Sequence, residues 1–193
     1  QVGTQLVSDG VHVTATGRRL LNTWRSDLVL TMEYGTVPTL VQPDKQPRTD
    51  CTFGSVAVTT GRIGVLERCP IDPGDRLTVY EPTNDDSDEP SVDFSSVVGG
   101  RSARVVALGD ELAAAVREGP TRLVVFNNDG NQVAEYPLDL PATDLAGDPP
   151  GLVVPTSKGA GLIYWFTGSR TIALSSTDLR PLWTVEDTLG PGT

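Results

Sequence analysis

The chain has 193 residues, of which 38% are hydrophobic and 21% charged, enough for one ordinary globular domain and too few for two large ones. Its formal net charge of −10 is the wrong sign for binding phosphate backbones, so we expect no nucleic-acid partner. No apolar run approaches the roughly 18 residues of a membrane span, and no signal segment opens the chain at Gln1. We leave open that an export or anchoring segment precedes Gln1.

Short β-rich runs recur along the chain in units of strand, turn and strand. Hairpin turns are predicted at Gly10, Gly61, Gly109 and Gly159, which are 51, 48 and 50 residues apart. A third strand is predicted around Leu28, Leu77, Leu123 and Ile172, at spacings of 49, 46 and 49 residues. A fourth, more polar strand follows around 37–41, 92–97, 132–138 and 181–185. Four short antiparallel strands repeating at this period are typical of β-propeller blades.

We therefore predict a single all-β domain over 1–193, built of β-propeller blades with repeats of about 1–50, 51–100, 101–147 and 148–193. A β-sandwich also has short strands, but it has no reason to repeat a four-strand unit. Asp110–Gly119 has the cap, alanines and terminal glycine of a helix, yet the repeat register predicts a strand there. Four repeats form either a small closed ring or part of a larger one. We favour the larger ring, with earlier blades upstream of Gln1, because no permuted strand is present to latch a closed ring.

One stretch of the fourth repeat, from Ala173 to Trp183, resembles the pyrroloquinoline-quinone (PQQ)-type propeller repeat. That repeat has Ala, an Asp two residues later, Thr-Gly, and a Trp ten residues after the Ala. The Ala-to-Trp spacing is kept here, whereas Ser175, Asp178 and Leu179 replace the polar docking residues. The resemblance implies a quinoprotein-like or outer-membrane-assembly-type propeller from an exported bacterial protein. An excess of arginine over lysine would suit an actinobacterium. Because the docking residues are lost, we predict no bound cofactor.

The two cysteines are predicted to form a disulfide. If Thr60-Gly61 is the tip of a hairpin, residues whose numbers sum to 120 or 121 face each other, and Cys51 and Cys69 sum to 120. The bridge would close a loop of about 19 residues, worth roughly 3 kcal/mol in the chain-entropy model. A disulfide indicates an extracytoplasmic compartment, which could be secreted, periplasmic or a membrane-anchored ectodomain. Two unrelated buried thiols are the alternative, and zinc chemistry is poorly supported because neither cysteine lies in a CxxC motif.

Residue types that carry catalysis or bind metals are sparse. His12 is the only histidine, and its place between Val11 and Val13 predicts a side chain that points to solvent. No Gly-x-Ser-x-Gly motif is present, so we predict no catalytic residue. The acidic run 85–89 lies between prolines and lacks the spacing of a calcium loop. We predict that this run is a flexible, metal-free loop.

Three consecutive aromatic residues, Tyr164, Trp165 and Phe166, alternate across one predicted strand. Packing between blades is the main interpretation, and an exposed contact surface for a protein or glycan is the alternative.

The function predicted from these features is that of a non-enzymatic extracytoplasmic interaction module that presents propeller loops to a protein or cell-envelope partner. The alternative is a propeller enzyme, either a quinoprotein-type dehydrogenase or a hydrolase using carboxylates such as Asp110, Asp144 or Asp148. The sequence determines neither the partner nor the oligomeric state.

Overall fold

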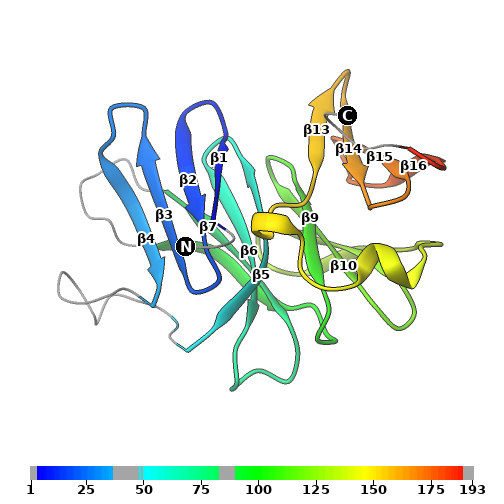
Figure 1. The fold of residues 1–193 in the computed structure, drawn as a ribbon, viewed down its shortest axis with the longest axis horizontal. Coiled ribbons are helices and arrows are strands. Elements are labelled where there is room, and N and C mark those ends of the chain that lie inside the picture. The colour runs from blue at the N-terminus through cyan, green and yellow to red at the C-terminus, as the bar shows by residue number, and fades with distance from the viewer. Residues whose placement is uncertain (1–3, 37–47, 49, 83–89, 189–193) are drawn as a thin grey trace.

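The computed structural model describes residues 4–36, 48, 50–82 and 90–188, which form four antiparallel sheets of four strands each (Figure 1). Sheet A contains β1 (Gln5–Ser8), β2 (His12–Thr16), β3 (Leu20–Arg25) and β4 (Leu30–Gly35). Sheet B contains β5 (Thr52–Thr59), β6 (Arg62–Arg68), β7 (Arg76–Glu81) and β8 (Ser91–Val97). Sheet C contains β9 (Arg104–Leu108), β10 (Leu112–Arg117), β11 (Arg122–Asn127) and β12 (Gln132–Pro137). Sheet D contains β13 (Thr156–Gly159), β14 (Leu162–Phe166), β15 (Thr171–Ser175) and β16 (Pro181–Val185).

The strands of every sheet pair in chain order, which confirms the predicted all-β, propeller-like fold. The segment with helical composition is strand β10, as the repeat register predicted. Its three alanines, Ala113, Ala114 and Ala115, are fully buried because sheets B and D cover opposite faces of sheet C. The three alanines therefore allow close packing of neighbouring sheets on both sides of β10, and they do not indicate a helix. Among the described residues, no helix is long and apolar enough to cross a membrane.

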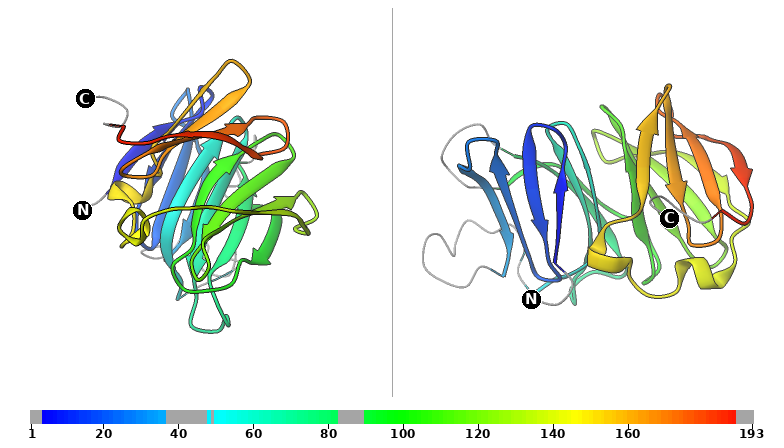
Figure 2. Two further views of the ribbon diagram at one scale, coloured as in Figure 1. Left: turned by 90° about the vertical axis from the view of Figure 1, so that its right-hand side faces the viewer. Right: turned by 45° about the horizontal axis from the view of Figure 1, so that its top comes forward.

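Three apolar cores join the sheets in the order A, B, C, D. Each core lies between the facing sides of two neighbouring sheets. Their main side chains are Leu21, Tyr34 and Phe53 between A and B; Leu77, Val79 and Leu108 between B and C; and Val125, Trp165 and Leu174 between C and D. In Figure 2, sheet A and sheet D stand at opposite ends of this row. Each of these two end sheets therefore has one face that no other described sheet covers.

The repeat has a period of 50 residues in its first two strands. One equivalent position on the first strands is occupied by Ser8, Val58, Leu108 and Lys158. Each of these residues pairs with the residue five positions further along, near the start of the second strand. Thr14, Gly64, Ala114 and Tyr164 occupy a second equivalent position, on the second strands.

One predicted strand of the first repeat is wrong. The third strand is β3, whereas Leu28 lies in the turn after it with a positive φ of 67°. Asp27 stabilises this turn by accepting a hydrogen bond from the Val29 amide at 3.2 Å and by pairing with Arg25. The fourth strand predicted around 37–41 lies outside the described residues.

The Cys51–Cys69 disulfide is confirmed. Near the hairpin tip the paired residues sum to 121, as for Thr59 and Arg62. A β-bulge between Phe53 and Ser55 then shifts the register so that pairs sum to 120. The two cysteines are consequently in direct opposition, with Cα atoms 4.2 Å apart.

Residues 138–155, which we call the strap, lead from the outer strand of sheet C to the inner strand of sheet D (Figure 1). The strap contains two short 3-10 helices, η2 (Ala142–Leu145) and η3 (Pro150–Leu152). On its way it contacts both other sheets. Thr16 of sheet A donates a hydrogen bond to the Gly151 carbonyl at 2.6 Å, and Val153 forms a parallel bridge with Val56 of sheet B. Asp148 pairs with Arg18 of sheet A at 3.2 Å and with Arg68 of sheet B at 2.6 Å.

Candidate functional site

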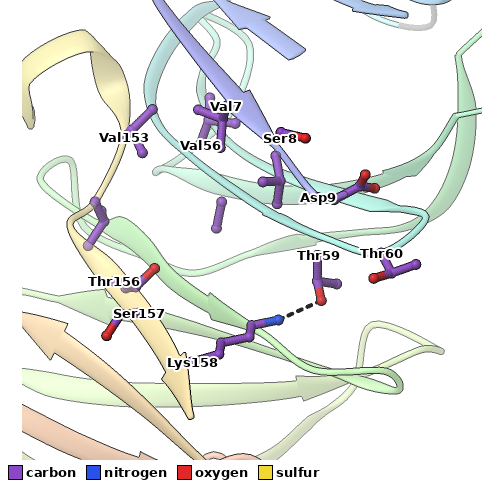
Figure 3. Close-up of a pocket in the computed structure, with 13 residues that line it drawn as sticks. Val7, Ser8, Asp9, Val56, Thr59, Thr60, Val153, Thr156, Ser157 and Lys158 are labelled. Atoms are coloured by element: carbon purple, nitrogen blue, oxygen red, sulfur yellow. Dashed lines mark hydrogen bonds between the residues drawn. The ribbon is translucent and has the colours of Figure 1, made fainter. Parts of the chain in front are cut away.

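A pocket of about 290 Å³ lies between the inner strands of sheets A, B and D (Figure 3). One side is lined by the end of β1 and another by β5 and the turn after it. The end of the strap and β13 form the third side. Its wall is both apolar and polar: the valines Val7, Val56 and Val153 line it, and the polar groups of Asp9, Thr59 and Lys158 lie toward the hairpin tips.

Asp9 joins the hairpin tips of sheets A and B. Its Oδ1 accepts the Val11 amide at 2.8 Å, and its Oδ2 accepts the Gly61 amide of sheet B at 3.0 Å. Burial raises the pKa of Asp9, but the backbone hydrogen bonds from His12, Val11 and Gly61 outweigh it and hold the pKa below its ordinary value. The carboxylate is therefore charged and already occupied by the protein's own donors.

The prediction that His12 points to solvent is wrong. The side chain of His12 is 6% exposed and turns toward sheet B, and its Nδ1 lies 3.2 Å from Asp9 Oδ2. In sheet A the polar side of β2 is the buried side, since Thr14 also bonds to the Thr23 hydroxyl there at 3.0 Å. Val13, on the same strand, faces away from sheet B. Side chains do alternate along β2, as predicted. The valine side, however, is not the inner side, because His12 and Thr14 find their hydrogen-bond partners within the fold and can be buried.

Lys158 projects from sheet D across the pocket toward sheet B (Figure 3). Its ammonium donates to Thr59 Oγ1 at 2.6 Å and to the Leu108 carbonyl at 3.3 Å. Burial lowers the pKa of Lys158. Among the described residues no carboxylate forms an ion pair with this group, so its neighbours are neutral acceptors. Lys158 links the inner strands of three sheets, B, C and D.

Arg62 fastens the hairpin tip of sheet B to that of sheet C. Its Nη1 donates to the carbonyls of Gly109 and Asp110 at 2.8 and 2.9 Å. Its Nη2 donates to Asp93 at 2.6 Å and to Asn128 at 2.8 Å. The sequence carried no signal for this role beyond an arginine directly after a turn. Together Asp9, Arg62 and Lys158 hold the inner hairpin tips of all four sheets at one end of the molecule, which we call the loop end.

The loop end exposes several acidic side chains. They lie in the β9–β10, β11–β12 and β15–β16 turns and comprise Asp110, Glu111, Asp129 and Asp178. Asp178 pairs with Arg180, whereas no ion pair is found for the other three among the described residues. Two apolar side chains accompany them on sheet A, since Leu28 is 79% and Val11 50% exposed. The loop end thus combines unpaired carboxylates with exposed apolar side chains among the described residues.

The acids considered for catalysis do not converge. Asp110 lies at the loop end, whereas Asp144 lies beyond the other end of β9, where its carbonyl accepts a hydrogen bond from Arg104. The Asp144 carboxylate accepts hydroxyl hydrogen bonds from Thr167 at 2.5 Å and Ser169 at 2.8 Å. Asp148 is held by the two arginines described above. The carboxylates of Asp144 and Asp148 thus have separate structural partners, and Asp110 lies at the opposite end of sheet C, so the three acids do not form one cluster.

One group of potential metal ligands occurs among the described residues. Atoms of Cys51, Glu67 and Cys69 lie within 4.8 Å of one another, but both sulfur atoms are in the disulfide. Glu67 is fully buried and accepts hydrogen bonds from the hydroxyls of Tyr34 and Tyr80. Burial and the charge of Glu67 raise the pKa of both tyrosines, which keeps them protonated as donors. The disulfide and the buried hydrogen bonds of Glu67 give this cluster a structural role. The acidic run 85–89 lies outside the described residues, and its metal-free state stays a prediction.

The three consecutive aromatic residues separate onto two faces of sheet D. Trp165 is 1% exposed and belongs to the core with sheet C, so its inclusion in a contact surface is corrected. Tyr164 and Phe166 are half-buried on the opposite face. On that face Tyr164 packs against Trp183, with ring centroids 5.9 Å apart. A contact made through Tyr164 and Phe166 stays a prediction.

One of the residues that differ from the PQQ-type repeat has an unusual backbone conformation. Leu179 stands where the motif has glycine, and it has a φ of 56° in the left-handed region. Ala173 and Trp183 are directly paired across β15 and β16. Leu179 therefore adopts a backbone conformation that glycine takes up more readily than leucine does.

No protein-family model and no curated protein matches the chain. Several solved structures resemble it. A protein of unknown function from Bacteroides caccae superposes with a TM-score of 0.52 at 9% identity, covering 96% of this chain and 62% of that one. Apo AztD from Citrobacter koseri gives 0.50 at 12% identity, covering 98% and 48%. A quinohemoprotein alcohol dehydrogenase from Pseudomonas putida HK5 gives 0.49 at 14% identity, covering 94% and 33%.

The chain thus spans between a third and about three fifths of the length of these proteins. At such identities the first two similarities support the fold alone. The exported and actinobacterial origin stays an expectation from the sequence.

Proposed function

We propose that the protein is a non-enzymatic interaction module whose loop end binds a protein or cell-envelope partner outside the cytoplasm. The observation that carries the proposal is the way hairpin tips of four sheets are fastened to one another by Asp9, Arg62 and Lys158. Loops held by such bonds lose less conformational entropy on binding, which favours affinity. The disulfide supports the extracytoplasmic location.

The chemistry of the loop end indicates the kind of partner. Its exposed carboxylates, which include those of Asp110 and Glu111, belong to a chain of net charge −10. A partner with a basic surface would be steered toward them.

Site-specific photo-cross-linking tests the proposal. A photoreactive residue is placed at Glu111 on the loop end or at Asp139, an exposed position at the other end of sheet C. We expect a discrete adduct with one envelope or secreted protein of the source cells from position 111 only. A charge reversal, Asp110→Lys, should reduce that adduct, whereas Asp139→Lys changes the net charge equally and should leave it intact. Equal adducts from both positions, or none, would overturn the proposal.

A further inference from the structure

A second pocket, which we call the arginine pocket, lies at the end of the molecule opposite the loop end. Arg68 is the last residue of β6, which begins at the loop end, and Arg101 precedes β9, which ends there. The volume of the pocket is about 490 Å³, within the range of small-molecule sites. The strap crosses this end of the sheets and forms one wall (Figure 2). The charged side chains of the lining are Arg18, Arg68, Arg101, Glu118 and Asp148.

We propose that the arginine pocket binds a small organic anion that carries two or three carboxylate groups. The inference does not rest on the partner proposed for the loop end, because the two surfaces lie at opposite ends of sheets B and C.

The first argument is the charge of the pocket. The chain has 25 acidic and 15 basic residues, yet three arginines and two carboxylates line this pocket. Arg104 adds a fourth positive charge at the strap wall, since it donates to the carbonyls of Asp144 at 2.8 Å and Gly147 at 2.6 Å. Among the described residues no carboxylate pairs with Arg104. The buried Asp75 beside Arg68 offsets one charge, so the balance stays positive.

The second argument is that most hydrogen-bond donors of the pocket are free. A guanidinium group has five N–H donors. Within the described part of the chain, the Arg101 side chain forms no hydrogen bond and no ion pair. Arg18 pairs with Asp148 alone, and Arg68 pairs with Asp148 and Asp75. An anion that enters the pocket would therefore find donors without displacing any of these bonds.

The third argument is that two of these arginines already pair with a carboxylate. Asp148 Oδ1 lies 2.6 Å from Nη1 of Arg68, and its Oδ2 lies 3.2 Å from Nη1 of Arg18. Arg68 is held in turn by Asp75, which also accepts the Ala103 amide at 2.8 Å. The Arg68 side chain is thus fixed before a ligand arrives, which lowers the entropic cost of binding.

The position of the free donors favours more than one acid group on an organic frame. Arg101 can hold one carboxylate through two parallel hydrogen bonds, and the remaining N–H groups of Arg18 and Arg68 can hold a second. The strap adds the methyl groups of Ala142 and Ala146 to the lining, which suits carbon atoms between the acid groups. An inorganic ion would leave most of the 490 Å³ unfilled.

Isothermal titration calorimetry with citrate, a tricarboxylate, tests the proposal at one fixed ionic strength. We expect one site per chain. Arg101→Gln should raise the Kd for citrate about tenfold or more. Arg180→Gln is the matched control, because it removes the same charge from a side chain that is 58% exposed at the loop end. The control should change the Kd by less than about twofold, since exposed charges so far apart are screened.

Removing a carboxylate from the pocket should have the opposite effect. Glu118→Gln and Asp148→Asn should each lower the Kd for citrate about threefold or more, because each removes a negative charge that repels the ligand. Glu111→Gln at the loop end is the control and should leave the Kd unchanged. Glu118 forms no ion pair among the described residues, so its variant keeps the contacts of the strap even if Asp148→Asn weakens them. Thermal unfolding of every variant would show which of them are folded.

Two further ligands define the chemical class. Acetate, with one carboxylate, should bind at least about tenfold more weakly than citrate. Inorganic phosphate that binds as tightly as citrate would overturn the assignment to a polycarboxylate. The absence of binding by wild type up to about 10 mM citrate would overturn the proposal. Equal weakening by Arg101→Gln and Arg180→Gln, or weaker binding by Glu118→Gln, would overturn it as well.

Discussion

Removing the disulfide should lower stability without changing the fold. The bond joins residues 18 apart in sequence, and closing a loop of that length in the unfolded chain is worth about 3 kcal/mol. For a domain of this size, 1 kcal/mol corresponds to about 2–4 °C, so the expected decrease in Tm is about 6–12 °C. The β5–β6 pairing and the A–B core do not depend on the sulfur atoms, which is why we expect unchanged far-ultraviolet circular dichroism.

Calorimetry of three samples separates the cross-link from packing. Oxidised wild type is compared with wild type reduced under denaturing conditions and refolded with a phosphine reductant, which keeps both sulfur atoms. The third sample is the double variant Cys51→Ala/Cys69→Ala, which also loses the packing of two buried side chains. Reduced wild type should melt between the other two samples. If it melts within about 1 °C of the oxidised protein, the loop-entropy reasoning is refuted.

Gly64→Ala should cost about 1–3 kcal/mol of unfolding free energy because its Cβ would meet a leucine methyl at 3.0 Å. Gly109→Ala, with nothing nearer than 3.6 Å, should change it by less than about 0.5 kcal/mol, and equal costs in urea denaturation would contradict the close approach. Asp9→Asn should lower Tm at neutral pH. The Asp9 pKa is depressed below its ordinary 3.8, so its stabilisation is present above about pH 4 and is lost as pH falls through the folded-state pKa. A difference in Tm that persists unchanged to pH 2 would count against this account. Arg62→Leu should cost about 3 kcal/mol and accelerate amide exchange at the β9–β10 turn. Arg117→Leu, which breaks an exposed ion pair, should cost no more than about 1 kcal/mol.

Properties that depend on pairing within one sheet could be predicted from the sequence. The repeat of strands, the placement of β10 and the opposition of Cys51 and Cys69 all follow from turn positions and residue numbers. The two-face arrangement around Trp165 follows from strand alternation alone. The bulge near Phe53 that brings the cysteines into register was not predicted, although the pairing it completes was.

Properties that depend on how sheets stack could not be predicted in the same way. His12 turns inward because Asp9 provides its partner in a buried setting, and a sequence pattern gives no information on which face will be covered. Arg62 reaches residues as far as 66 positions along the chain, so no local spacing identifies its role. The sequence predicted turns at the loop end but not the hydrogen bonds that join them, because Asp9, Arg62 and Lys158 bond to residues of other repeats.

The strap connects both ends of the row of sheets. It carries the chain into sheet D and, through Asp148, also holds arginines of sheets A and B. A single proteolytic cut near Gly147 would therefore act at two distant places at once. It would release the covalent link to sheet D, and it would loosen the clasp between the first two sheets. Under mechanical load on sheet D, the strap would transmit tension to sheets A and B directly, in addition to the path through the core between sheets C and D and through Lys158.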